Sequence, residues 1–119
     1  MYDFIMLPKE YRLKKRTAFA ATYRTGKTLH YGGITVFIGK EKENDIPTKI
    51  GFVVSKKIHK RAVKRNQIKR KMRESCRLLI KEGKISAKYL SLIFVASSKL
   101  LSKNYNEINS AIKNLAERL

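Results

Sequence analysis

Apolar and polar positions along the chain follow two different periods, which separate the expected strands from the expected helices. Residues 34–40 carry β-branched side chains in alternation, so we predict a strand there. Residues 49–55 and the strongly apolar residues 89–97 are predicted as two further strands. The polar residues 41–48, which lie between the first two strands, include Asn, Asp and Pro and are typical of a turn.

Helical spacing of apolar residues predicts the remaining elements. Residues 62–81 contain no Gly or Pro, and at about 100° per residue their apolar side fills one stripe. The stripe consists of Ile68, Met72, Ser75, Cys76 and Leu79. Residues 105–119 show the same period, and a shorter helix is expected at residues 18–25, with Thr17 as its cap and Gly26 at its end. This order of elements predicts an α+β fold, a two-layer sandwich of helices packed on a small sheet.

An excess of positive charge is the strongest feature of the composition. The 119 residues include 28 Lys and Arg against 9 Asp and Glu, which gives a formal net charge of +19 and a pI near 10.3. Charge of one sign opposes compaction, so a polyanionic partner is expected: nucleic acid, an anionic membrane surface or an acidic protein. The composition favours nucleic acid among these three.

Length and apolar content predict one domain over residues 1–119, with residues 1–6 as a flexible extension. No apolar run approaches the ~20 residues that span a bilayer, so no membrane partner is expected. The one cysteine, Cys76, excludes an internal disulfide and is typical of a cytoplasmic protein. Its place on the apolar stripe favours a buried side chain over a nucleophile.

Positive charge is concentrated around the start of the long predicted helix. Residues 46–73 contain no acidic residue, and ten of the eighteen residues in 56–73 are Lys or Arg, beginning with a connector at residues 56–61. Beside the apolar stripe, one ridge spans about a third of the helix circumference. This basic ridge consists of Asn66, Lys69, Arg70, Arg73 and Arg77. Its side chains suit contacts to RNA phosphates and sugars, whereas Arg65 lies nearer the apolar edge, where packing of its stem is the alternative.

Three aromatic residues form a second candidate surface. Phe19 and Tyr23 stand four residues apart and therefore share one face of the predicted helix. Phe37 points to the strand face opposite to the Ile and Val residues of residues 34–40. Aromatics in such places belong either to the core or to a surface on which bases of single-stranded RNA stack, and spacing alone leaves both interpretations open.

The sequence indicates no catalytic centre made by protein side chains. His30 and His59 are isolated, with no carboxylate or cysteine at metal-ligand spacing. There is no Gly-rich phosphate loop, nucleophile elbow or paired carboxylate, and the nine acidic residues are scattered. We therefore expect no catalytic residue on this chain, and no metal or cofactor bound by the protein alone.

The basic segment also resembles the signature of a known family. Ser55-Lys56-Lys57 is followed by Ala-Val-Lys-Arg-Asn-Gln-Ile-Lys-Arg at residues 62–70 and then by Arg73-Glu74. This spacing is similar to that of the bacterial ribonuclease P protein subunit. One departure is Gln67, which stands where the family has the second arginine of its Arg-Asn-Arg run.

The resemblance continues at residues 7–13, Phe19 and residues 50–52, and covers about residues 7–115. It implies a mostly antiparallel four-stranded sheet with three helices and a left-handed β-α-β crossover, which is a minority topology. It also implies a partner, a large catalytic RNA that holds the catalytic magnesium ions. Together the two remove the 5′ leader from precursor tRNA by hydrolysis.

The resemblance further implies two sets of RNA-contacting residues. The set for the catalytic RNA is Arg61, Lys64, Arg65, Asn66, Lys69, Arg70, Arg73 and Arg77. The set for the precursor-tRNA leader is Arg12, Phe19, Tyr23, Phe37, Ser55, Lys56 and Lys57. The expected function is therefore that of the RNA-binding, non-catalytic subunit of a ribonucleoprotein nuclease. A structural ribosomal RNA-binding protein is the alternative, and DNA is not an expected partner.

Overall fold

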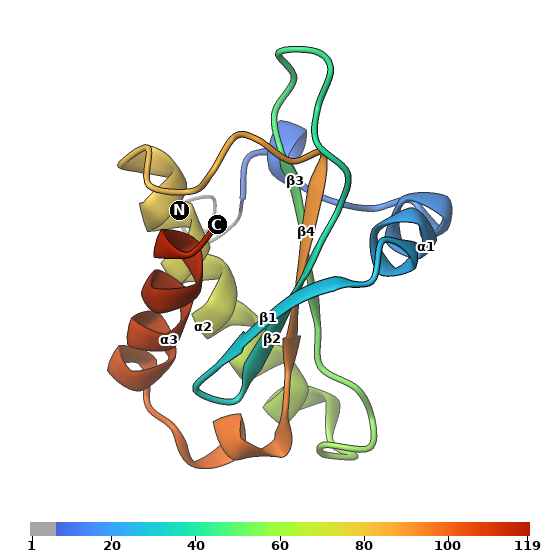
Figure 1. Cartoon of the computed structure of the whole chain (residues 1–119). Helices are drawn as coiled ribbons and strands as arrows, with labels where there is room; N and C mark the ends of the chain where they lie inside the picture. The colour runs from blue at the N-terminus through green and yellow to red at the C-terminus, as the bar shows by residue number, and fades with distance from the viewer. Residues whose placement is uncertain (1–6) are drawn as a thin grey trace.

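Three α-helices and two short 3-10 helices surround one four-stranded sheet in the computed structural model, which describes residues 7–119 (Figure 1). The elements in chain order are η2 (Lys9–Tyr11), α1 (Arg16–Arg24), β1 (Lys27–Tyr31), β2 (Ile34–Ile38), β3 (Lys49–Val53), α2 (Ala62–Lys81), β4 (Ser91–Ala96), η3 (Ser98–Ser102) and α3 (Tyr105–Glu117). Helices α2 and α3 cover one face of the sheet, and α1 lies on the other face. The extension predicted at residues 1–6 lies outside the described residues.

The sheet has the strand order β1-β2-β4-β3, so the latest strand in the sequence lies inside it. β1 pairs with β2 and β2 pairs with β4 in antiparallel fashion, whereas β3 and β4 are parallel. The predicted four-stranded, mostly antiparallel sheet is therefore confirmed. The parallel pair is joined through α2, and the left-handed course of that connection stays a prediction.

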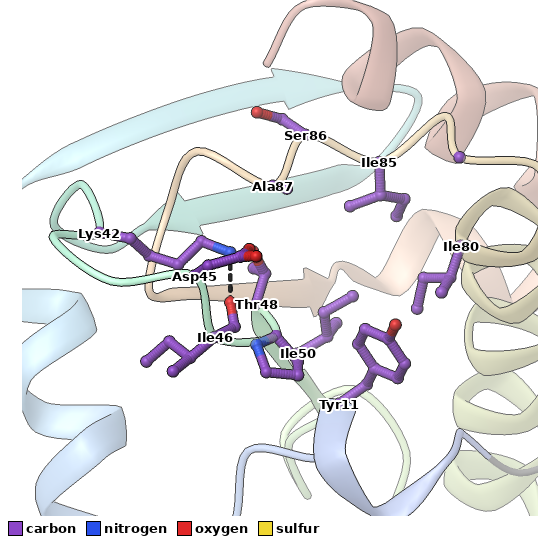
Figure 2. A pocket seen from close by; sticks show the side chains of 12 residues that line it. Tyr11, Lys42, Asp45, Ile46, Thr48, Ile50, Ile80, Ile85, Ser86 and Ala87 are labelled. Carbon is purple, nitrogen blue, oxygen red and sulfur yellow. Dashed lines mark hydrogen bonds between the residues drawn. The ribbon is translucent and has the colours of Figure 1, made fainter.

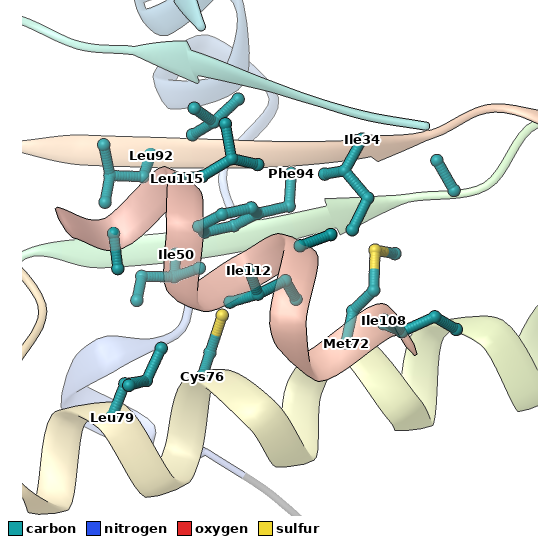
Figure 3. Close-up of a cluster of buried hydrophobic side chains, with 14 of the residues drawn as sticks. Ile34, Ile50, Met72, Cys76, Leu79, Leu92, Phe94, Ile108, Ile112 and Leu115 are labelled. Carbon is teal, nitrogen blue, oxygen red and sulfur yellow. The ribbon is translucent and has the colours of Figure 1, made fainter. Parts of the chain in front are cut away.

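The core lies between the sheet and the helix pair α2–α3 (Figure 3). The five residues of the predicted apolar stripe are the five buried residues of α2. The apolar side of β2 faces them, because Ile34 and Val36 are fully buried while Phe37 points to the opposite face. Phe94 of β4 is also fully buried and lies near the middle of this cluster.

Helix α3 begins at a capping box. The Asn104 Oδ1 atom accepts a hydrogen bond from the Glu107 backbone N at 2.9 Å, and Glu107 Oε1 accepts one from the Asn104 N at 3.1 Å. These reciprocal bonds satisfy two backbone groups that the first helical turn leaves free. The helix then buries Ile108 and Ile112 against the core, as the sequence period predicts.

Two expectations about the N-terminal half were wrong. Helix α1 begins at Arg16 rather than Ala18, and its N-cap is Lys15 without a side-chain cap, so Thr17 lies inside the helix. Strand β1 was not predicted, because it is an edge strand whose side chains are exposed except for the half-buried Leu29. Its strand structure therefore leaves no apolar alternation in the sequence.

Candidate RNA-binding interface

A buried hydroxyl pair fixes α1 on the sheet. Thr22 is 1% exposed, and its Oγ1 atom donates to the Ala18 carbonyl oxygen at 2.8 Å. The same atom lies 2.5 Å from Oγ of Ser91, on the first residue of β4. Because both hydroxyls are buried and partnered, α1 has a defined place on the sheet. The sequence analysis did not find this contact, since the two residues are 69 positions apart.

The three predicted aromatics lie where α1 meets the sheet. The rings of Tyr23 and Phe37 meet edge to face, with centroids 4.8 Å apart and an interplanar angle of 80°. Phe19 covers Gly51 of β3 so closely that a Cβ atom there would come within 2.7 Å of the Phe19 ring. Tyr23 remains 38% exposed, and its partial burial raises the pKa of its hydroxyl above the ordinary 10.0. The three aromatic side chains therefore pack between α1 and the sheet, while part of Tyr23 remains accessible to solvent.

Beside α1, part of the same sheet face is not covered by any helix of residues 7–119. The strand register places Thr35 of β2 next to Val95 of β4, and Val95 next to Val53 of β3. All three side chains are half-buried, and we call this row the open sheet face. Across the β1–β2 pair, His30 Nδ1 lies 2.8 Å from Thr35 Oγ1. The row is apolar with one hydroxyl, and it leads along β3 toward Ser55.

The connector at residues 56–61 follows β3 and projects beyond the sheet, on the side of α1 in Figure 1. Ser55, Lys56 and Lys57 are all exposed, as a site for a charged ligand requires. A turn, in which the Ile58 N donates to the Ser55 carbonyl oxygen at 3.1 Å, presents the two lysines. These residues are therefore available at the end of the open sheet face.

The residues of the predicted basic ridge on α2 differ in exposure. Asn66 and Arg70 are exposed, and so are Arg61 and Lys64 in the set predicted for the catalytic RNA. In contrast, Arg65 is half-buried and donates from Nη1 to two backbone carbonyl oxygens of the connector. Among the ridge cations, Arg70 is therefore the most accessible, because Lys69, Arg73 and Arg77 are half-buried.

Lys69 and Arg73 lie on the side of α2 that faces the N-terminal segment. They line a cleft of about 240 Å³ together with Arg12, Phe19 and other residues. Burial lowers the pKa of Arg73 below its ordinary value, and the nearby charges of Arg12 and Arg70 add to the effect. Arg12, which the sequence analysis placed in the leader set, is therefore next to the basic ridge. Uncompensated cations around one cleft suit a phosphate group.

Arg77 differs from the other ridge residues because it has an acidic partner. Its Nη2 and Nε atoms donate to the Glu74 carboxylate at 2.6 and 3.2 Å. The hydrogen bond to Glu74 raises the pKa of Arg77. The pair neutralises the charge that Arg77 would offer to a phosphate. The ridge residues without an acidic partner in residues 7–119 are therefore Asn66, Lys69, Arg70 and Arg73.

A further basic cavity adjoins Arg12 and was not predicted as a site. It has a volume of about 670 Å³ and lies between η2, the start of α1 and the start of β3. Its cationic lining residues are Lys9, Arg12, Lys14, Lys15 and Lys49. The basic composition of residues 8–16 could have indicated this cavity from the sequence. Lys49 is distant in the sequence, and only the fold places it beside these residues.

A cavity of about 360 Å³ lies at the other end of α2, between the turn after β2 and the chain before β4 (Figure 2). Tyr11, Ile50, Ile80 and Ile85 give it an apolar floor, and Lys42 Nζ donates to the Ile46 carbonyl oxygen at its rim. No residue of either predicted RNA-contacting set lines it.

Residues 7–119 contain neither a membrane-spanning helix nor a metal-ligand cluster. No helix in this range is long and apolar enough to cross a membrane. No group of three or more His, Cys, Asp or Glu side chains in the same range is placed to hold a metal ion.

Comparisons with known proteins agree with this geometry. The model of the Ribonuclease P family matches residues 7–119. The chain is 36% identical to the ribonuclease P protein component of Clostridium kluyveri over 108 residues, which cover 91% of this chain and 93% of the relative. The ribonuclease P protein component of Clostridium novyi is 34% identical over 112 residues, which cover 94% of this chain and 96% of the relative.

Solved structures lead to the same family. The RNase P protein of Staphylococcus aureus is 29% identical and superposes with a TM-score of 0.76, over 92% of this chain and 95% of that one. The RNase P protein of Thermotoga maritima is 25% identical and superposes with a TM-score of 0.76, over 91% of this chain and 96% of that one. The fold, the signature on α2 and these matches together show that the chain belongs to the ribonuclease P protein family.

Proposed function

We propose that this chain is the RNA-binding protein subunit of ribonuclease P, and that it assists a catalytic RNA in removing the 5′ leader from precursor tRNA. The observation that carries the proposal is the presence of two adjoining RNA-compatible surfaces on one fold. Exposed and half-buried cations occupy the ridge on α2, while Tyr23 and Phe37 lie beside the open sheet face. One surface suits a phosphate backbone, and the other suits unpaired bases.

In this proposal the ridge binds the catalytic RNA and the open sheet face binds the leader. A leader nucleotide stacks on the accessible edge of the aromatic pair, and Lys56 and Lys57 neutralise the adjacent phosphates. The protein thereby reduces the phosphate repulsion between the two RNAs and positions the substrate. The chemical step belongs to the RNA, and this assignment rests on the family resemblance.

Magnesium enters the proposal only through the catalytic RNA. Hard cations require several oxygen ligands at one place, and residues 7–119 offer no such cluster. The proposal therefore assigns the magnesium ions to the catalytic RNA and no magnesium site to residues 7–119. The proposal also includes a cytoplasmic location, for which the unpaired Cys76 is the supporting observation.

Reconstitution tests the proposed function. The chain is mixed with a ribonuclease P RNA and precursor tRNA at low magnesium, and release of the 5′ leader is measured with and without protein. We expect leader removal to increase when the protein is added. No increase would reject this function and would favour a structural ribosomal RNA-binding role. A competition between RNA and DNA of the same sequence at fixed salt checks the preference for RNA, because only RNA offers 2′-hydroxyl groups.

A further inference from the structure

The side chain of Arg65 joins the connector to the long helix. Arg65, in the first turn of α2, donates from Nη1 to the carbonyl oxygen of His59 at 2.9 Å and to that of Lys60 at 2.8 Å. Residues 56–61 contain no helix or strand of their own. The remaining support comes from Ile58, which packs against the edge of the core, and from the Arg61 N, which donates to His59 Nδ1 at 3.1 Å.

The composition of the connector makes this support necessary. Four of its six residues are Lys or Arg, so its like charges repel one another. Arg65 is itself a cation, but it meets backbone carbonyl oxygens, which carry partial negative charge and accept its hydrogen bonds. A planar guanidinium can hold two adjacent carbonyl groups from one nitrogen in a fixed direction. Its contacts therefore oppose the spreading of the connector.

The position of Arg65 separates it from the basic ridge. Arg65 is half-buried and its guanidinium donates hydrogen bonds to the connector, whereas the side chains of Lys69, Arg70 and Arg73 make no hydrogen bond within residues 7–119. Because α2 is a twenty-residue helix packed on the core, a contact to its first turn fixes the connector relative to the whole sheet. The connector in turn carries Lys56 and Lys57 at the end of the open sheet face.

We propose that Arg65 is a positioning residue for the substrate: it holds the connector so that Lys56 and Lys57 meet the leader phosphates. This role rests on the proposed function, which assigns the leader to the open sheet face. It differs from the role implied by the resemblance, in which Arg65 is a contact to the catalytic RNA. We call the two hydrogen bonds from Arg65 to the connector the Arg65 clamp. Through this clamp, the helix that binds the catalytic RNA sets the geometry of the connector that binds the leader.

A double-mutant cycle tests the role in the reconstituted holoenzyme. The measured quantity is the ratio of the dissociation constants for mature and precursor tRNA, which reports leader recognition. We expect Arg65→Ala to lower this ratio by roughly fivefold, on the scale of lost charge-assisted contacts. In the Lys56→Ala/Lys57→Ala background, Arg65→Ala should lower the ratio no further, because the lysines through which it acts are absent. Equal effects in both backgrounds would overturn the proposal.

Lys71→Ala is the matched control, since it removes one positive charge from the same helix and lies outside both RNA-contacting sets. It should leave the ratio unchanged. A fall equal to that of Arg65→Ala would show that net charge, rather than the clamp, sets leader recognition.

Amide hydrogen exchange of the free protein provides a readout without RNA. The amides of Ile58 and Arg61 should exchange roughly tenfold faster in Arg65→Ala than in Lys71→Ala, while the core amides of β4 keep their rates. Unchanged exchange in the connector would remove the basis of the inference even if the chain supports leader cleavage. If cleavage fails but connector exchange rises, the clamp stands and the proposed function is what fails.

Discussion

Phe19 lies where α1 crosses β3, and its ring occupies the space that a side chain at position 51 would need. The residue is half-buried, so one face of the ring packs on the Gly51 backbone while another part remains accessible. The two interpretations that the sequence left open, core and RNA contact, are therefore compatible in this one side chain. The contribution of Phe19 to the stability of the fold and its contribution to RNA binding can be measured separately.

Phe19→Ala should weaken the binding of precursor tRNA more than that of mature tRNA. The expected loss for precursor is about 1–3 kcal/mol, the range for stacking of one base on an aromatic ring. The free energy of unfolding should fall by less than the ~3–5 kcal/mol of a fully buried phenylalanine. Binding to both tRNAs in the holoenzyme and urea denaturation of the free protein measure the two effects. A lower stability with unchanged discrimination would assign Phe19 to the core alone.

Cys76 gives a prediction about pH. The thiol is fully buried, and this burial raises its pKa well above the ordinary 9.0. Because the pKa of the thiol is higher in the folded state than in the unfolded state, the neutral thiol stabilises the fold fully below pH 9. This stabilisation is lost as the pH rises above 9. The loss should be about 1.4 kcal/mol per pH unit between pH 9 and the raised value.

Urea midpoints measured from pH 7 to 10 check this dependence, with Cys76→Ala as the control that removes the thiol. The difference between the two proteins should change only above pH 9. Rapid alkylation of Cys76 at pH 8 without denaturant would contradict its burial.

At the scale of the element, α2 combines an apolar stripe with a basic ridge, and the ridge has members of unequal charge. Arg70 is exposed without an acidic partner in residues 7–119, whereas Arg77 binds the Glu74 carboxylate. Both arginines occupy the same side of the helix, so they form a natural pair for comparison.

Arg70→Ala should weaken binding to the catalytic RNA and lower the magnitude of the salt slope by about 1, as expected when one phosphate contact is lost. Arg77→Ala should have a smaller effect on both quantities, because Glu74 already neutralises this charge. Binding titrations at several salt concentrations measure both variants. An equal loss in the two variants would mean that the Glu74 pair opens when RNA binds.

The elements also show what a sequence can predict. The bounds of α2 follow from a long helical period without Gly or Pro, and its buried residues follow from the same period. Strand β1 leaves no such signal, because an exposed edge strand has no apolar face to bury. The ridge was predicted from angles within one helix. The Arg65 clamp and the meeting of Arg12 with Arg73 depend on non-local geometry, which local spacing does not contain.

At the scale of the molecule, a formal net charge of +19 is combined with an apolar core that lies between the sheet and two helices. Binding of RNA to such a surface releases counterions from the phosphates, so the affinity should depend steeply on salt. The accessible ridge, the connector lysines and the Arg12 cleft together provide enough cations for about six phosphates.

The logarithm of the affinity for RNA should therefore fall against the logarithm of salt concentration with a slope of about −4 to −5. Titrations of the wild-type protein with catalytic RNA between low and physiological salt measure this slope. A nearly flat response would show that base contacts and shape, rather than phosphate neutralisation, provide the affinity.

The strand order has a consequence for how the protein is made. β4 pairs with both β2 and β3, yet it is synthesised after the connector and after all of α2. A growing chain on the ribosome therefore presents its most basic segment before the central strand exists to organise it. Pairing of distant segments is slow relative to local helix formation. During this interval the nascent chain has the charge to attract any nearby RNA, but it lacks the arranged surfaces that would select one.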